Sequence, residues 1–241
     1  MRKLGIFWLT AFVALQLLLE SPQAEMGPCR PERGWITCGN GDGAARIVEK
    51  TISPSGRLAF AWRLTDRPPS ETPAEIDPKL ENLIVRIEDG AVVTKSHSLY
   101  WDLGSKIAKA FLFTAWSSDS RLLIKVEQRG ANASAELFSF DQNDRALGPV
   151  ELVGAIKPAV LSQMKSTNDA ARYGLVFSSH PAMTIDNQGL IHLHVQAIEE
   201  DGPDIPVYEL TLQVSDEVNS LNAMVNSIAP YPKASIFITV H

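Results

Sequence analysis

The sequence predicts a mainly β protein built from antiparallel hairpins, with one or two added helices. A unit of polar turn and apolar strand recurs three times, and its strands are rich in β-branched and aromatic residues. Only the start of the chain holds an apolar stretch that approaches the length of a membrane span. We therefore expect a signal peptide over residues 1–24, followed by a single mainly β domain over residues 25–241.

The recurring unit is an apolar residue, a four-residue polar turn and a strand. Ser53, Ser117 and Asp186 begin the three turns, and each side chain can bond the backbone two residues on. Gly56 and Gly189 supply a positive φ at little steric cost. The three copies span residues 52–62, 116–126 and 185–195. A second apolar strand follows each copy, at residues 83–87, 135–140 and 207–214.

Two of these copies carry a family resemblance. Residues 53–60, Ser-Pro-Ser-Gly-Arg-Leu-Ala-Phe, and residues 116–123, Trp-Ser-Ser-Asp-Ser-Arg-Leu-Leu, resemble the S-P-D-G-x-x-L-A-F signature of WD40-like blades in TolB-type β-propellers. The resemblance implies blade-like sheets and a periplasmic setting, but no catalytic or binding residue, because the matching positions are architectural. Three copies are fewer than the blades of a closed ring. We therefore expect a propeller-like (partial) arrangement or a sandwich.

The N-terminus has the three parts of an export signal. Arg2 and Lys3 precede an almost uncharged apolar run over residues 4–19, and small residues lead to a predicted cut after Ala24. An uncleaved anchor is the alternative. We expect a secreted or periplasmic protein whose mature chain has no membrane span.

The two cysteines, Cys29 and Cys38, are predicted to form a disulfide in an oxidising compartment. Closing this short loop stabilises a fold by about 2 to 3 kcal/mol. A redox pair is the alternative, but the spacing is not the C-x-x-C that poises a thiol.

Two helices and a terminal strand are expected outside the repeats. Residues 215–228 combine a capping serine, two acids and an apolar face at helical spacing, and a shorter helix is expected to begin at Pro158. Residues 234–240 predict a strand, and the proline-rich segment 66–78 predicts an exposed loop between strands.

One pair of residues resembles half of a metal site. On a strand, His192 and His194 point to one face, and His180 or Asp186 can add a third ligand. The alternative is the exposed polar face of an amphipathic strand.

Other polar and aromatic groups are weaker candidates. The acidic turns at residues 141–144 and 199–204 suit calcium less well than solvated hairpins, because neither supplies a complete ligand loop. Four tryptophans are either a binding platform or core residues: Trp35, Trp62, Trp101 and Trp116. Core packing is favoured, because Trp62 and Trp116 lie in or beside the repeat strands.

The composition and the motifs exclude some classes of function but do not identify a ligand. A net charge of −6 argues against a nucleic-acid partner, and the sequence singles out no catalytic residue and no cofactor. We expect an exported, non-catalytic binding or interaction module with a protein or small-molecule ligand. The alternatives are a metal-assisted hydrolase centred on His192 and His194, and a partial propeller that is completed by self-association.

Overall fold

The computed structural model describes most of the chain that follows the predicted signal peptide. The described residues are 26–74, 76–104, 106–107, 109–164, 173–179, 182–199, 206–217 and 220–231. The signal peptide, His180 and the predicted strand at residues 234–240 lie outside them.

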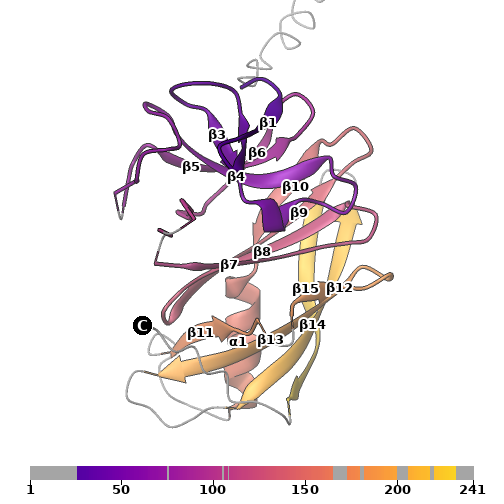
Figure 1. Ribbon diagram of the computed structural model, residues 1–241. Helices are drawn as coiled ribbons and strands as arrows, with labels where there is room; N and C mark the ends of the chain where they lie inside the picture. Colours follow the sequence, from indigo (N-terminus) through magenta and orange to yellow (C-terminus); the bar gives the residue numbers. More distant parts are fainter. Residues whose placement is uncertain are drawn as a thin grey trace, which may run out of the picture.

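Three antiparallel sheets and one α-helix make up the described part of the chain, which confirms the predicted mainly β class. The sheets follow one another along the molecule in chain order, with the third sheet and the helix at the end opposite the first sheet (Figure 1). The described strands do not close into a ring. The arrangement is therefore consistent with either a partial propeller or a sandwich.

The first sheet is a six-stranded meander that curls over itself. Its strands, in spatial order, are β1 (Cys29–Glu32), β2 (Trp35–Cys38), β3 (Ala45–Ile47), β4 (Leu58–Leu64), β5 (Leu80–Arg86) and β6 (Val92–Ser96). A single 3-10 turn, η1 (Glu49–Thr51), separates β3 from β4. The backbone N–H of Cys29 donates to the carbonyl of Ile87 at 3.2 Å, so β1 reaches the turn that follows β5. Small side chains, among them Ala59 and Ala61, fill the inside of the curl.

The second sheet is the middle layer. Its strands are β7 (Phe111–Trp116), β8 (Leu122–Arg129), β9 (Asn132–Phe140) and β10 (Ala146–Glu151), in the order β10-β9-β8-β7. Alternate residues of β9 face opposite ways, because successive side chains of a strand point to opposite faces. Phe138 and Phe140 pack with the first sheet, and Ala135 and Leu137 pack with the third.

The third sheet holds β11 (Tyr173–Phe177), β12 (Thr184–Ile185), β13 (Leu190–Glu199), β14 (Val207–Glu217) and β15 (Ser220–Pro230). The helix α1 (Val153–Gln163) packs Ile156 and Val160 into the same core. The helix that was expected to begin at Pro158 is thus present, but it begins earlier. The first two residues of α1, Val153 and Gly154, donate their backbone N–H groups to the carboxylate of Glu151 at 2.8 and 3.0 Å.

The three predicted turns have the same construction. In each sheet the turn joins the first two strands of a four-stranded meander, β3–β6, β7–β10 or β12–β15. The N–H of Gly56, Ser120 or Gly189 donates to the carbonyl of the first turn residue at 2.8 to 3.0 Å. All three donors have positive φ, of 72°, 63° and 77° in that order. The local repeat is therefore structural, and Ser120 adopts the conformation that glycine adopts in the other two copies.

The predicted helix at residues 215–228 is wrong, because its described residues, 215–217 and 220–228, form the end of β14 and most of β15. Leu221, Ala223 and Val225 alternate into the core, while Met224 is 66% exposed. A bulge then shifts the register, since Val225 pairs with Leu212 but Ser227 pairs with Thr211. After the extra residue the next core position is residue 228, and the resulting 221, 225, 228 spacing imitates a helical face.

Candidate functional site

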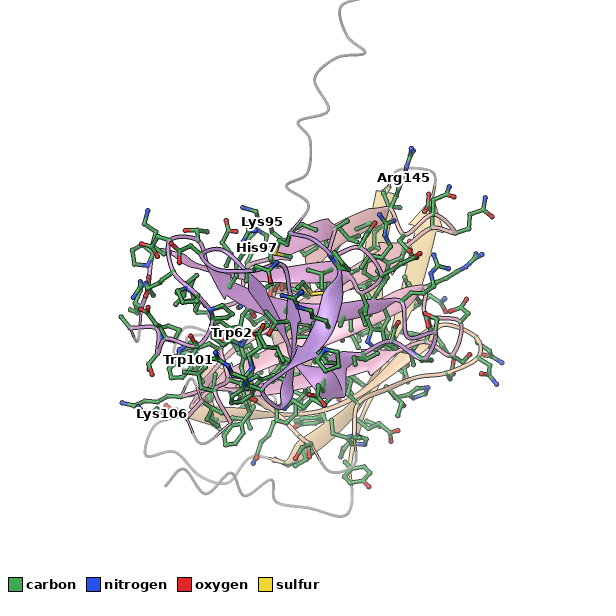
Figure 2. All side chains as sticks on the ribbon, turned by 45° about the horizontal axis from the view of Figure 1, so that its top comes forward. Trp62, Lys95, His97, Trp101, Lys106 and Arg145 are labelled. Carbon is green, nitrogen blue, oxygen red and sulfur yellow. A yellow bond between two sulfur atoms is a disulfide. The ribbon has the colours of Figure 1, made fainter. Side chains whose placement is uncertain are left out.

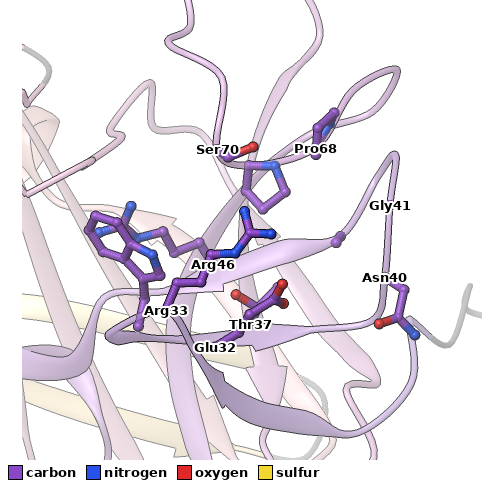
Figure 3. Close-up of a pocket in the computed structure, with 11 residues that line it drawn as sticks. Glu32, Arg33, Thr37, Asn40, Gly41, Arg46, Pro68 and Ser70 are labelled. Atoms are coloured by element: carbon purple, nitrogen blue, oxygen red, sulfur yellow. The ribbon is translucent and has the colours of Figure 1, made fainter.

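The strongest candidate site is a cavity of about 300 Å³ at the end of the first sheet. We call it the Trp35 pocket, and its walls include Glu32, Trp35, Thr37, Arg46, Pro68 and Pro69. Figure 3 shows the loop with Pro68 and Ser70 facing the strands that carry Thr37 and Arg46. The predicted exposed loop at residues 66–78 therefore supplies one wall, and β2 and β3 supply the other.

Arg46 is the central charged group of the pocket. Its guanidinium carbon lies 3.1 Å from the centre of the Trp35 ring, and the residue is only 7% exposed. No described residue accepts a hydrogen bond from its side chain. Burial lowers the pKa of Arg46, and the charges of Asp102 and Glu49 offset part of that shift. The guanidinium thus lines the cavity, and its N–H groups are open to a partner from outside the protein.

Strand register explains why these side chains meet. Thr37 pairs with Arg46 and Arg46 pairs with Trp62, so the three side chains share the face that turns toward the second sheet. Trp35 lies two residues before Thr37 on that same face. The segment after β6 also comes close to this ring, since a Cβ added to Gly104 would lie 3.2 Å from the indole.

A second polar cluster joins the first and second sheets. The Lys125 ammonium is fully buried and donates to the hydroxyls of Ser96 and Ser98 at 2.9 and 2.5 Å. It also lies 2.7 Å from a carboxylate oxygen of Glu136. Burial lowers the pKa of Lys125 and is opposed by the charges of Glu136 and Glu127. Sequence reasoning missed this cluster, because its members come from three segments with no shared motif.

This cluster holds the two sheets together and does not have the arrangement of a catalytic serine and lysine. The hydroxyl of Ser96 donates to Glu136 at 2.6 Å, and that of Ser98 donates to Glu127 at 2.5 Å. Both hydroxyl protons are therefore held by carboxylates, while the ammonium has three partners. The neighbouring His97 is 83% exposed, near Lys95 at the surface (Figure 2). Its ring nitrogen Nδ1 lies 2.9 Å from Glu136.

Two of the predicted metal ligands, His192 and His194, lie on the face of β13 that is opposite its core residues, and Asp186 lies in the turn before this strand. The Nε2 atom of His192 is 3.2 Å from a carboxylate oxygen of Asp186. His194 is 7% exposed, and its ring packs edge-on against Tyr231 with centroids 4.5 Å apart. Neither ring nitrogen of His194 has a hydrogen-bond partner. His180 lies outside the described residues, which contain no group of three or more His, Cys, Asp or Glu side chains able to hold a metal ion.

The acidic turn at residues 141–144 is a hairpin turn between β9 and β10. The Asp141 carboxylate accepts the backbone N–H groups of Asn143 and Arg145 at 2.7 and 2.9 Å. Asp144 pairs with Arg57 at 2.6 Å, which ties this turn to the first sheet. Of the second acidic turn, residues 199–204, only Glu199 lies within the described residues.

The tryptophans divide between core and pocket. Trp62 and Trp101 belong to the core cluster that the first two sheets share, and Figure 2 labels both on the same side of the molecule. The indole N–H of Trp116 donates to the carbonyl of Thr51 at 2.8 Å. Core packing is thus correct for these three, and of the four only Trp35 lines the pocket.

The predicted disulfide is present between Cys29 and Cys38 and links β1 to β2 covalently.

Comparison with known proteins leaves the family open: no family model matches the chain, and neither does any curated protein. Within the described residues, no helix is both long enough and apolar enough to span a membrane.

Proposed function

We propose that this chain is an exported, non-catalytic binding module whose ligand occupies the Trp35 pocket. The observation that carries the proposal is the state of Arg46. Its guanidinium is buried and stacked on Trp35, and it has no hydrogen-bond acceptor among the described residues while it faces a cavity.

The N–H groups of Arg46 are open to the cavity and have no acceptor among the described residues. A ligand can therefore supply an acceptor without first breaking a hydrogen bond within the protein. A hydrogen bond to a charged group contributes about 1.5 to 3 kcal/mol, and stacking on the indole holds the guanidinium in place for it.

The scaffold holds these groups in place before a ligand arrives. Trp35, Thr37 and Arg46 stand on paired strands, and the disulfide joins the two strands of the hairpin that carries Trp35. Groups fixed on strands lose little conformational freedom on binding, which favours affinity. The disulfide suits an oxidising compartment, as does the export signal that the sequence predicts.

The composition of the pocket supports binding over catalysis. Its described lining residues include no histidine, cysteine or lysine. The hydroxyls of Thr37 and Ser70 therefore have no neighbouring base of those kinds to activate them. Glu32 is exposed at the rim.

Thermal unfolding of the full chain, recovered from an exporting host, tests the proposal. A broad set of small metabolites is screened for a rise in Tm, first on the native protein and then on a Trp35→Ala variant. We expect at least one compound that stabilises the native protein and not the variant. Arg63→Gln is the matched control, because Arg63 is paired with Glu81 on the same sheet outside the pocket.

Two results would contradict the proposal. One is stabilisation that is unchanged in Trp35→Ala, which places the ligand elsewhere. The other is turnover of an ester, phosphate or glycoside substrate that a single substitution abolishes. Mass spectrometry of the recovered protein also tests the predicted cut after Ala24, because an intact N-terminus argues against a cleaved signal.

A further inference from the structure

The geometry points to the chemical class of the ligand: we infer that the Trp35 pocket binds a small, flat monocarboxylate through the guanidinium of Arg46. This inference rests on the proposed function and deepens it.

The carboxylate follows from the orientation of the guanidinium. Arg46 places its guanidinium carbon 3.1 Å from the centre of the Trp35 ring, and the N–H groups of a guanidinium point outward in the guanidinium's own plane. The planar fork of arginine matches a carboxylate through two parallel hydrogen bonds. A ligand bound in this way places its carboxylate in the plane of the guanidinium. The hydroxyl of Thr37, on the paired strand, can donate a further hydrogen bond.

The flat body follows from the walls of the cavity. A group conjugated with the carboxylate lies in the same plane as the carboxylate and the guanidinium, beside the Trp35 ring. Pro68 and Pro69 supply apolar surface from the loop on the other side. A cavity of about 300 Å³ is at the small end of the range for ligand sites, which suits one or two fused rings.

The single charge follows from the charges around the site. Glu32, Arg33 and Arg46 line the pocket, and their formal charges sum to one positive charge. Asp102 and Glu49 already interact with Arg46 from outside the cavity. The lining therefore compensates the single charge of a carboxylate, whereas one charge of a dianion such as a phosphate monoester would stay uncompensated.

The experiment compares three kinds of probe on the full protein. The probes are benzoate and 2-naphthoate, the corresponding neutral amides, and phenyl phosphate. Binding is followed by two-dimensional NMR through the indole N–H resonance of Trp35, which is assigned by its loss in Trp35→Phe. We expect the carboxylates to shift this resonance saturably, with a Kd in the millimolar range or below, as suits ligands of this size.

Substitutions then locate the contact. Arg46→Gln removes the charge and the fork, and we expect at least about tenfold weaker binding of the carboxylates. Arg46→Lys keeps the charge but loses the fork, and we expect a loss nearly as large. Thr37→Val, which keeps the size of the side chain, is expected to weaken binding less. Arg63→Gln is the control and should bind as the native protein does.

Some outcomes overturn the inference. They are carboxylates that leave the Trp35 resonance unmoved, amides that bind as tightly as the acids, phenyl phosphate that binds more tightly than benzoate, or an equal loss in Arg63→Gln. Because Arg46→Gln can destabilise the sheet, the Tm of each variant is measured, and Arg46→Lys and Thr37→Val decide the result if Arg46→Gln unfolds.

The same data separate this inference from the proposed function. If neutral amides bind at Trp35 as tightly as the acids, the pocket is a binding site and only the carboxylate is wrong. If neither these probes nor any compound of the metabolite screen acts through Trp35, the proposed function fails as well.

Discussion

Replacing Lys125 by methionine tests how strongly the first two sheets are joined. The ammonium is fully buried and bonded to Ser96, Ser98 and Glu136. Lys125→Met keeps the length of the side chain but leaves the Glu136 carboxylate, also buried, without its counter-charge. Breaking a buried pair from one side costs about 3 to 5 kcal/mol, because an uncompensated charge remains. Domains are stable by only about 5 to 15 kcal/mol, so a large part of the stability would be lost.

Urea unfolding followed by tryptophan fluorescence measures this loss. Two further variants make the measurement specific. Lys95→Met removes a surface partner of Glu81, and an exposed pair contributes about 0 to 1 kcal/mol. Lys125→Met combined with Glu136→Leu removes both charges, and we expect it to recover much of the lost stability. The reasoning fails if Lys125→Met costs no more than Lys95→Met, or if the double variant is no better than Lys125→Met alone.

Three other measurements test the rest of the structure. Cys29→Ser combined with Cys38→Ser should lower the free energy of unfolding by about 2 to 3 kcal/mol, measured in urea without reductant. An unchanged free energy would mean that the disulfide does not constrain the unfolded chain. Burial lowers the pKa of His194, with opposition from Glu209 and support from His192. The unfolded chain therefore binds more protons, and stability should be full above about pH 6.5 and fall as the pH drops toward the folded pKa. That slope should shrink in His194→Phe, and an unchanged slope would assign it to other groups. Protein purified without chelators should contain less than one equivalent of metal by mass spectrometry, because His192 is bonded to Asp186 and the His194 ring packs on Tyr231. A stoichiometric ion that is lost in His192→Ala with His194→Ala would instead support the metal-assisted hydrolase.

The repeated turns show what short-range sequence can predict. Ser53, Ser117 and Asp186 each bond backbone N–H groups four or five residues on, within the same turn. These hydrogen bonds need no distant partner, so the turn residues alone specify them. The strands that follow were predicted for the same reason, because alternating or continuous apolar runs indicate which face is buried.

The error at residues 215–228 shows where such patterns are ambiguous. Leu221, Val225 and residue 228 fit one face of a helix, and they also fit a strand that contains one bulge. Pairing with β14 decides between the two. The residues inside the segment do not indicate this pairing, so their spacing taken alone predicts a helix.

Only one of the two main residues of the pocket could be singled out from the sequence. Trp35 was one of four tryptophans considered as a platform, whereas Arg46 had no motif to mark it. Arg46 matters because β2 pairs with β3 in a register that places it beside Thr37 and over Trp35. Register depends on both strands of a pair, so the sequence of one strand does not predict it.

The sequence by itself determined the mainly β class, the disulfide and the three turns, because each depends on residues near one another in the chain or on composition. The tertiary structure alone decided which strands pair, where Lys125 finds its acids and where Arg46 meets Trp35. These features join residues from separate segments, and their energies come from burial and charge in the assembled fold. The candidate site belongs to this second group, since the lack of an acceptor for Arg46 exists only once the sheet has formed.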